Sequence, residues 1–301
     1  MDRLGAMETY IRVVDAGSFS AAARHLEIGQ PAVSKAIAQL EQWLGVSLLL
    51  RSTRSITPTE AGRNFYDHAK KAIEEADDAV VAARGAASGL VGRLRVSASV
   101  CFARINIVPK LHTFLDLHPN LEIEMILDDR NIDLVEEGID VALRMGDLQS
   151  SSLTARKIGE CRRVALATPA YLEEHGEPKT PDELLAHQTV IYTRDHGGEN
   201  WSFRKGTADA SIRVQGRFRV SAAEGLREAV LAGMGIGIAS EWVFVNELSS
   251  GAVRTFLNDW DLPRQNLWAV FPSGRRASTK TREFVDFVQT CIAPTPLSIA
   301  A

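Results

Sequence analysis

The chain has 301 residues, of which 45% are hydrophobic and 24% are charged. This composition is that of a folded globular protein, and it excludes wholesale disorder. No window approaches ~18 consecutive apolar residues, so the sequence also excludes a membrane-spanning helix. A single hydrophobic core seldom grows beyond about 250–300 residues, so we expect at least two domains.

The charge balance alone does not indicate a nucleic-acid-binding protein. Residues 1–95 carry 12 Lys and Arg against 11 Asp and Glu, and residues 96–301 carry 22 against 27, which gives the net charge of −4. Any contact with DNA must therefore depend on where individual charges lie. Cys101, Cys161 and Cys291 are too far apart to form a disulfide framework or a close-spaced metal motif. This cysteine usage fits a reducing cytoplasm, and the first residues lack the basic and apolar pattern of a secretory signal.

The first 45 residues predict three short helices. Apolar residues recur at helical spacing from Leu4 to Val14, and Gly17 is suited to end that helix in the left-handed conformation. Ser18 is an N-cap for a second helix over residues 19–26. Pro31 stands in the first turn of a third helix, which Gly45 closes. The second and third helices, separated by a short turn with a glycine, are typical of a helix-turn-helix.

The third helix has a polar side opposite its apolar stripe, formed by Gln30, Ser34, Lys35 and Gln39. Side chains of these types reach phosphates or base edges in DNA-binding proteins. A solvated face on any small helical bundle would give the same pattern. The spacing alone leaves both interpretations open.

Residues 46–57 predict a small hairpin, because two short β-prone runs flank a tip rich in hydroxyl groups and arginine. Arg51 and Arg54 at this tip are suited to enter a minor groove, where the electrostatic potential favours arginine. The alternative is that they are two ordinary surface arginines in a turn.

A long helix is predicted from Glu60 to about residue 87, after a capping hydroxyl and with an acid in its first turn. Apolar residues then recur at steps of four and three, which is a heptad seam. Because most of the seam is alanine, a partner helix can approach closely. We expect this helix to join two subunits, and the alternative is a helix that lies on its own domain. The seam consists of Phe65, Ala69, Ala72, Ala76, Ala79 and Ala83.

From Leu94 onwards, strand and helix patterns alternate, which indicates layers of helices on sheets. About 200 residues suit two small α/β lobes, and a cleft between lobes is the usual place for a small ligand. The predicted strands span residues 94–98, 121–127, 141–144, 163–168, 189–192, 235–239 and 267–271. The predicted helices span residues 105–117, 132–137, 169–175, 222–232, 242–248 and 280–291.

The motifs do not favour an enzyme. The glycines of residues 233–237 follow a helix and precede a strand, which is the reverse of the order that a dinucleotide-binding loop needs. The sequence has no nucleophile elbow and no paired-histidine zinc motif, and its seven histidines are scattered. We therefore expect no catalytic residue, metal or cofactor.

Several runs of residues resemble the LysR-type transcriptional regulator family. They are residues 17–23, 30–37, 40–41, 44–45, 49–51 and 57–62 in the N-terminal part, and residues 94–96, 118–119, 140–146, 169–172 and 232–239 in the C-terminal part. The resemblance covers essentially the whole chain. It implies a multidomain protein with an all-α winged helix-turn-helix domain, a long linker helix and an α/β two-lobed effector domain similar to periplasmic binding proteins. The implied limits are residues 1–58, 59–88 and 89–301, with lobe I at about 93–161 and 270–293 and lobe II at about 162–269.

The resemblance implies a cytoplasmic regulator whose binding to double-stranded promoter DNA is modulated by a small-molecule effector. It implies a homo-oligomer, a dimer of dimers, and it is compatible with contact to RNA polymerase but not with a membrane partner. Gly29 stands where many members carry Ser or Thr, which removes a hydroxyl that would contact a phosphate. The implied DNA-binding residues are Ser18, Ser20, Gln30, Pro31, Ser34, Lys35, Arg51 and Arg54.

For the effector, the resemblance points to the turn after the first strand of the effector domain, where backbone N–H groups at a helix start would favour an anion. Arg130 and Arg144 would be the counter-charges of an organic or aromatic acid, and internal salt bridges are the open alternative. Cys101 is either a redox switch or a buried filler, and the lack of a nearby resolving cysteine favours the filler. A solute-binding protein is the rival function, against which residues 1–87 argue. The implied effector-binding residues are Ser99, Val100, Cys101, Phe102, Arg130, Arg144, Gly146, Ser221 and Ala222.

Overall fold

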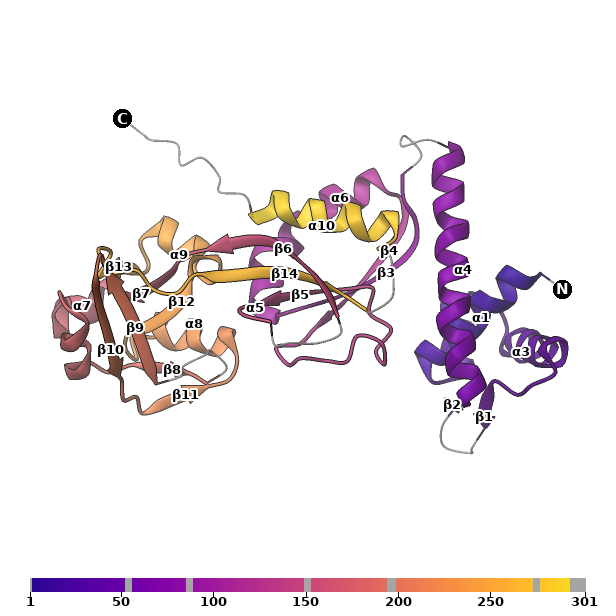
Figure 1. The fold of residues 1–301 in the computed structure, drawn as a ribbon, viewed down its shortest axis with the longest axis horizontal. Coiled ribbons are helices and arrows are strands. Elements are labelled where there is room, and N and C mark those ends of the chain that lie inside the picture. Colours follow the sequence, from indigo (N-terminus) through magenta and orange to yellow (C-terminus); the bar gives the residue numbers. More distant parts are fainter. Residues whose placement is uncertain are drawn as a thin grey trace. The chain divides into compact units, whose positions relative to one another are not determined.

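The computed structural model describes residues 2–51, 56–84, 89–148, 153–193, 199–272 and 277–292. The chain divides into two compact units (Figure 1). The first unit contains Met1–Gly92 with His118–Leu121 and Ser278–Lys280, and the second contains the other residues. Each unit has hydrophobic clusters of its own.

The first unit consists of helices and a small hairpin. In chain order its elements are α1 (Arg3–Ala16), α2 (Phe19–His25), α3 (Gln30–Leu44), β1 (Leu49–Arg51), β2 (Ile56–Pro58) and α4 (Glu60–Arg84). Gly17 ends α1 with a φ of 60°, and Ser18 Oγ accepts the N–H of Ala21 at the start of α2. Thr59 Oγ1 accepts the N–H of Gly62 at 2.9 Å and so caps α4. These ends confirm the first two predicted helices and the start of the long one, and the antiparallel pairing of β1 with β2 confirms the strands of the predicted hairpin.

The core of the first unit includes the beginning of α4. Tyr10 on α1 is fully buried, and its ring meets that of Phe65 edge-on with the ring centroids 5.4 Å apart. Tyr66 donates a hydrogen bond of 2.6 Å to Asp15 Oδ1. Because these contacts hold the first turns of α4 against α1, this part of α4 packs within its own unit.

The second unit contains a five-stranded mixed sheet in the order β4-β3-β5-β14-β6. Its strands are β3 (Val91–Ala98), β4 (Asn120–Leu127), β5 (Val141–Met145), β6 (Thr154–Cys161) and β14 (Gln265–Phe271). Strand β3 is parallel to β5, whereas β14 is antiparallel to both β5 and β6. Phe114 of α6 (Leu111–Leu117) contacts Phe284 and Phe287 of α10 (Thr279–Ile292), so these two helices pack together. We call this half of the unit lobe I.

The other half, lobe II, contains an antiparallel sheet in the order β12-β7-β13. The chain enters lobe II immediately after β6 and returns to lobe I at β14 (Figure 1). The elements of lobe II are β7 (Arg163–Ala167), α7 (Pro169–His175), β8 (Val190–Tyr192), β9 (Asn200–Lys205), β10 (Ala208–Arg213), β11 (Phe218–Val220), α8 (Ala223–Leu231), β12 (Gly237–Ser240), α9 (Val245–Ser250) and β13 (Arg254–Phe256).

One predicted helix of the second unit is wrong. Residues 132–137 form turns rather than a helix, because the Asp133 carboxylate accepts the N–H groups of Val135 and Glu136 and Gly138 leaves the segment with a φ of 62°. The return to lobe I begins with Gln265, which pairs with Cys161 of β6.

The predicted helix over residues 105–117 is instead a composite that starts earlier. It consists of α5 (Val100–Phe102), a π-helical turn (Ala103–Ile107), a 3₁₀ turn (Val108–Lys110) and α6. Pro109 has no N–H group to donate, which breaks the regular ladder of hydrogen bonds between the π turn and α6. A π turn inside a helix is rare and is frequent at functional sites.

Candidate functional site

The start of α3 presents a polar surface next to α2. Gln30, Pro31 and Lys35 are exposed and Ser34 is half-buried, whereas Val33 and Ile37 on the opposite side of the helix are fully buried. This arrangement follows from the helical period, which places the apolar stripe and the polar side on opposite faces. The four predicted contact residues of α3 therefore lie on its accessible side.

The two helices are linked by a hydrogen bond at this surface. Ser20 Oγ on α2 donates to Gln30 Oε1 on α3 at 3.1 Å, and this fixes the direction of the Gln30 amide. Ser18 uses its hydroxyl to cap α2, so its predicted role near phosphates has to coexist with that bond. Gly29 makes no side-chain cap for α3.

The hairpin that follows α3 is fastened to it by Glu41, a residue that the sequence did not single out for this role. The Glu41 carboxylate accepts the N–H groups of Leu48 and Leu49, at 2.7 and 3.2 Å. Strands β1 and β2 pair antiparallel in a register that places Leu49 opposite Pro58. The tip of the hairpin with Arg54, and the side chain of Arg51, lie outside the described residues.

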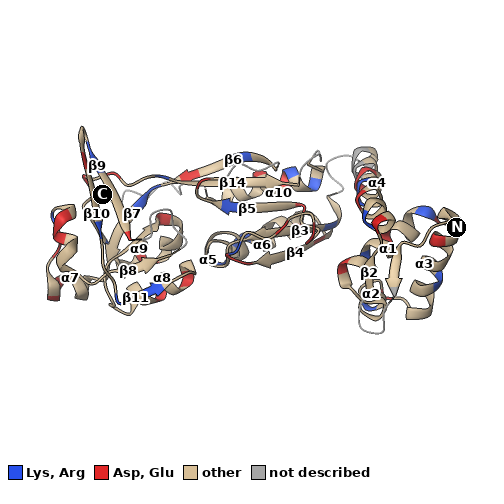
Figure 2. Cartoon of the chain, turned by 60° about the horizontal axis from the view of Figure 1, so that its bottom comes forward, with Lys and Arg blue, Asp and Glu red and all other residues tan. Residues whose placement is uncertain are grey.

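The predicted heptad seam of α4 divides into two parts. Phe65 and Ala69 pack inside the first unit, and Ala69 is only 1% exposed. Ala69 is thus covered by its own chain, whereas Phe65 is half-buried. Ala72 and Ala76 are half-buried, and Ala79 and Ala83 are exposed. The rest of the helix carries two adjacent lysines, Lys70 and Lys71, followed by a run of acidic residues over residues 74–78 (Figure 2).

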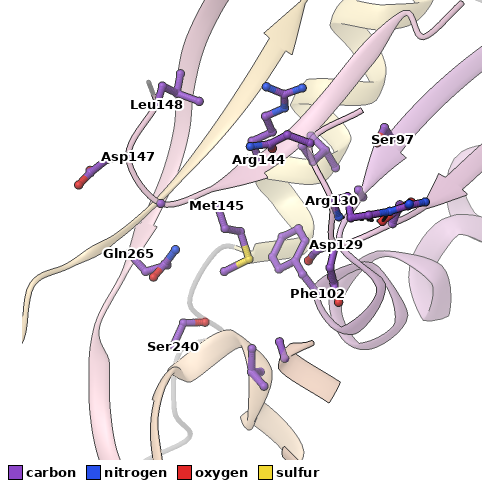
Figure 3. A pocket seen from close by; sticks show the side chains of 18 of the residues that line it. Ser97, Phe102, Asp129, Arg130, Arg144, Met145, Asp147, Leu148, Ser240 and Gln265 are labelled. Atoms are coloured by element: carbon purple, nitrogen blue, oxygen red, sulfur yellow. Dashed lines mark hydrogen bonds and ion pairs between the residues drawn. The ribbon is translucent and has the colours of Figure 1, made fainter. Parts of the chain in front are cut away.

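A cavity of about 770 Å³ lies in the second unit and is lined by residues of both lobes. Five of the residues that the resemblance implies for effector binding line it: Ser99, Phe102, Arg130, Arg144 and Gly146. Figure 3 shows Phe102 and Met145 in the middle of this cavity, with Arg144 on one side and Ser240 on the other. The predicted residues Val100, Cys101, Ser221 and Ala222 are described by the structure but do not line the cavity.

The helix start after β3 does not offer the open anion site that was expected. The N–H of Val100 donates to Asp129 Oδ1 at 3.2 Å, so a carboxylate of the protein itself occupies that position. A ligand carboxylate that bound the N–H of Val100 would have to displace Asp129.

The two predicted counter-charges behave differently. Arg130 is exposed and forms a bidentate ion pair with Asp128. Its Nη2 donates to Oδ2 at 2.7 Å, and its Nε donates to Oδ2 at 3.0 Å and to Oδ1 at 3.1 Å. These hydrogen bonds raise the pKa of Arg130. Its charge is thus compensated internally, which was the open alternative.

Arg144 is a better candidate for contact with a ligand. Its Nη2 donates to the carbonyl of Ile132 at 3.0 Å. Burial lowers its pKa, and the nearby Asp133 opposes this effect. The guanidinium group therefore carries a partly desolvated positive charge at the cavity wall.

The cavity also contains polar residues that the sequence did not indicate. Arg163, at the start of β7, and Ser240, at the end of β12, line it from lobe II, and Gln265 lines it from the start of β14. The sequence contains one indication of Arg163, which is its place directly before the apolar run Val164–Ala167. That signal does not reveal which strand ends converge, because convergence depends on the pairing of strands distant in sequence.

Cys101 is fully buried in a hydrophobic cluster with Val164 and Leu166 of lobe II. Burial raises the pKa of its thiol to about 12, and a hydrogen bond with Glu224 acts in the same direction. The reactive thiolate is therefore scarce at neutral pH. This environment is that of a buried filler rather than of a redox switch.

The composite helix after β3 connects the two lobes at one side of the cavity. Asn106 in the π turn is buried, and its Nδ2 donates to the carbonyl groups of Phe102 and Trp242, each at 3.0 Å. The rings of Phe102 and Trp242 meet edge-on, with centroids 5.6 Å apart. Arg104 also pairs with Glu224 of α8 at 2.7 Å. A segment that belongs to lobe I is thus anchored in lobe II.

A helix-turn-helix with a hairpin wing, joined to a two-lobed α/β unit with a polar cavity, defines a DNA-binding transcriptional regulator with an effector-binding domain. Residues 4–63 match the bacterial regulatory helix-turn-helix protein of the lysR family, and residues 87–291 match the LysR substrate binding domain. The chain belongs to the LysR-type transcriptional regulator family. No helix among the described residues has the length and hydropathy to cross a membrane.

Individual relatives agree with this assignment. An HTH-type transcriptional regulator of Xanthomonas campestris pv. campestris (strain 8004) is 35% identical over 285 residues, which cover 93% of this chain and 83% of that protein. The HTH-type transcriptional regulator DmlR of Escherichia coli (strain K12) is 32% identical over 291 residues, which cover 96% and 94%. The structure of CrgA, a LysR-type transcriptional regulator from Neisseria meningitidis, is similar with a TM-score of 0.61 at 28% identity, covering 95% of this chain and 97% of that chain. These relatives are regulators of transcription, not enzymes.

Proposed function

We propose that the first unit binds promoter DNA in the major groove through the start of α3, with the wing in the adjacent minor groove. The observation that supports this most is the polar side of the helix, with Gln30 and Lys35 exposed and Ser34 half-buried, opposite a fully buried stripe. The N-terminal residues of a recognition helix are those that meet base edges. Ser18 and Ser20 lie near phosphates in this proposal, and Arg51 and Arg54 act from the wing.

The test is a gel shift with DNA from upstream of the gene, with the Lys35→Ala variant and Lys179→Ala as control. Lys179 is an exposed lysine of the second unit, so the control removes the same charge elsewhere. Lys35→Ala should weaken binding by about 1–3 kcal/mol on the specific sequence if the side chain contacts a base. An equal loss on unrelated DNA would instead assign Lys35 to a phosphate. A wild-type chain that binds no DNA from this region would contradict the proposal.

We further propose a cytoplasmic homotetramer, a dimer of dimers, with the domain limits 1–58, 59–88 and 89–301 and with subunits joined through α4. Two recognition helices of such a dimer would bind an inverted repeat whose half-sites lie ~34 Å apart. Contact with RNA polymerase at the promoter is compatible with this arrangement.

The effector in this proposal is a small organic or aromatic acid bound in the cavity between the two lobes. Two partly desolvated arginines and several apolar side chains in one cavity support this choice. The effector changes DNA binding only if it has different affinities for two states of the assembly. Titrating the acid into the protein–DNA complex measures that difference directly.

A further inference from the structure

Helices α2 and α3 are held in a fixed relation by the turn between them and by their shared core. Glu27 in this turn is left-handed with a φ of 53°, and the N–H of Ile28 donates to the carbonyl of Ala23 at 3.1 Å. Both helices bury their apolar residues in one hydrophobic cluster. The contact between Ser20 on α2 and Gln30 on α3 is therefore set by the fold around it.

The hydroxyl group of Ser20 has one hydrogen to donate, and that hydrogen goes to Gln30 Oε1 at 3.1 Å. Phosphate oxygens of DNA only accept hydrogen bonds. While the bond to Gln30 is present, Ser20 does not donate to a phosphate even where it lies near one. The hydroxyl group of Ser20 thus acts on DNA through the side chain of Gln30.

The bond to Ser20 sets which end of the Gln30 amide is presented. A glutamine amide has an accepting oxygen at one end and an NH₂ group with two donors at the other. Because Oε1 of Gln30 is turned towards α2, its Nε2 lies at the end that faces away from Ser20. Gln30 is exposed at the first residue of α3, where a recognition helix meets base edges. Its side chain is thus oriented as a donor.

The backbone at the start of α3 supplies few donors of its own. Gly29 has no side chain to cap the helix, and Pro31 has no N–H group. The N–H groups of Ala32 and Val33 both donate to the carbonyl of Gly29, at 2.9 and 3.3 Å. The Gln30 amide is therefore the group at this point that can donate to a base.

The purine bases distinguish a held amide from a free one. In the major groove guanine offers two acceptors, N7 and O6, whereas adenine offers the acceptor N7 beside the donor N6. A glutamine that uses both ends of its amide pairs with adenine. A group that only donates matches guanine, as the donors of Arg and Lys do.

We propose that Ser20 is a positioning residue that sets the base preference of Gln30, so that the start of α3 selects guanine over adenine. The proposal rests on the proposed DNA binding and adds the base edge that α3 selects. In the free chain, water competes for the exposed bond between Ser20 and Gln30. Exclusion of water at a DNA interface strengthens such a bond.

The experiment selects binding sites for the full chain from random double-stranded DNA and then measures affinities on single-base variants of the selected site. Gln30→Ala identifies the base pair that Gln30 contacts, because the preference at that pair alone is lost. At this pair the wild type should bind guanine about threefold to tenfold more tightly than adenine.

Ser20→Ala should reduce this ratio to about twofold or less, because the released amide can turn and pair with adenine. Ser20→Thr keeps the hydroxyl group and should retain the wild-type ratio. Ser202→Ala is the control, since Ser202 is an exposed serine on β9 of the second unit. The ratio is measured within one variant, so a partly unfolded sample does not change it.

A phosphate contact would give a different result. Ser20→Ala would then lose affinity equally on guanine and adenine, and the unchanged ratio would overturn the positioning role while DNA binding stands. A wild-type preference for adenine at this pair, or an equal loss on all sequences in Gln30→Ala, would also overturn it. A wild-type chain that selects no sequence would contradict the proposed DNA binding itself, and the role of Ser20 with it.

Discussion

The three cysteines are the residues whose environment most clearly limits their chemistry. Cys101, Cys161 and Cys291 are all buried, and burial raises the pKa of each thiol, to about 12 for Cys101 and about 11 for Cys161. A raised pKa leaves the thiol protonated below that value, so reactivity increases only as the pH rises towards it. The spacing of the cysteines in the sequence excluded a disulfide framework, but only the structure shows that each thiol is enclosed.

We predict that a disulfide reagent such as Ellman's reagent reacts slowly with all three thiols of the native chain at neutral pH, because the thiolate is scarce and access is blocked. After unfolding in guanidinium chloride, all three should react quickly. The absorbance of the released thiolate measures both rates. Rapid reaction of one thiol in the native chain, lost in Cys101→Ser, would restore the redox interpretation.

At the scale of elements, the first turns of α4 pack against α1 of the same unit, whereas Ala79 and Ala83 further along the helix are exposed. The sequence pattern could not separate these two uses, because a heptad seam has the same spacing whether its partner is in the same chain or in another. Only Tyr10 and Asp15, which lie about fifty residues earlier, identify the partner of the first turns. Packing between distant segments is information that local periodicity does not contain.

We predict that Ala69→Glu and the pair Ala79→Glu with Ala83→Glu have different effects. The first buries a charge in the core and should lower the free energy of unfolding of the first unit by about 3 kcal/mol or more. The pair should leave helix content unchanged but dissociate the subunits. Circular dichroism and sedimentation velocity distinguish these outcomes.

The control is Ala61→Glu, since Ala61 is exposed on the first turn of α4 and lies outside the seam. It should change neither stability nor subunit association. An intact dimer in the paired variant would assign the subunit contact to another surface.

Local sequence signals predict some of the helices and strands and not others. Helices with clear caps, such as α2 and α4, were located from Ser18 and Thr59. Strands β6, β9, β10, β11 and β13 were missed, because exposed residues dominate several of them and hide the apolar alternation; the first four residues of β6 are all exposed. Phe102 and Arg144 were found in the cavity, but Arg163, Ser240 and Gln265 were not. Their meeting depends on the registers of β7 with β12 and of β14 with β6.

At the scale of the whole effector-binding unit, the two lobes share a helix rather than only two crossing strands. Cys101 belongs to the hydrophobic cluster of lobe II, and Asn106 is bonded to the carbonyl of Trp242. A wide opening of the lobes at this side would separate Cys101 from the hydrophobic cluster of lobe II and break the hydrogen bond between Asn106 and Trp242. The response to a ligand is therefore expected as a small shift about this joint.

We predict that Asn106→Ala lowers the free energy of unfolding of the chain by about 1–3 kcal/mol, because the buried Trp242 carbonyl loses its donor. Urea denaturation measures this loss. Asn246→Ala is the control, since Asn246 is exposed on α9. Unchanged stability of Asn106→Ala would show that the joint does not hold the lobes together.

The bond from Glu41 to the first wing strand bears on how a DNA preference is transplanted between regulators. The Glu41 carboxylate in α3 accepts two consecutive backbone N–H groups at the start of the hairpin, so the helix and the wing are held in a fixed relative position. A chimera that exchanges only residues 30–39 keeps these two hydrogen bonds, so the wing keeps its position relative to α3. An exchange that extends to residue 41 and removes the carboxylate also removes both hydrogen bonds to the hairpin. The position of the wing would then change together with the recognition helix, and the transferred DNA preference would be weaker.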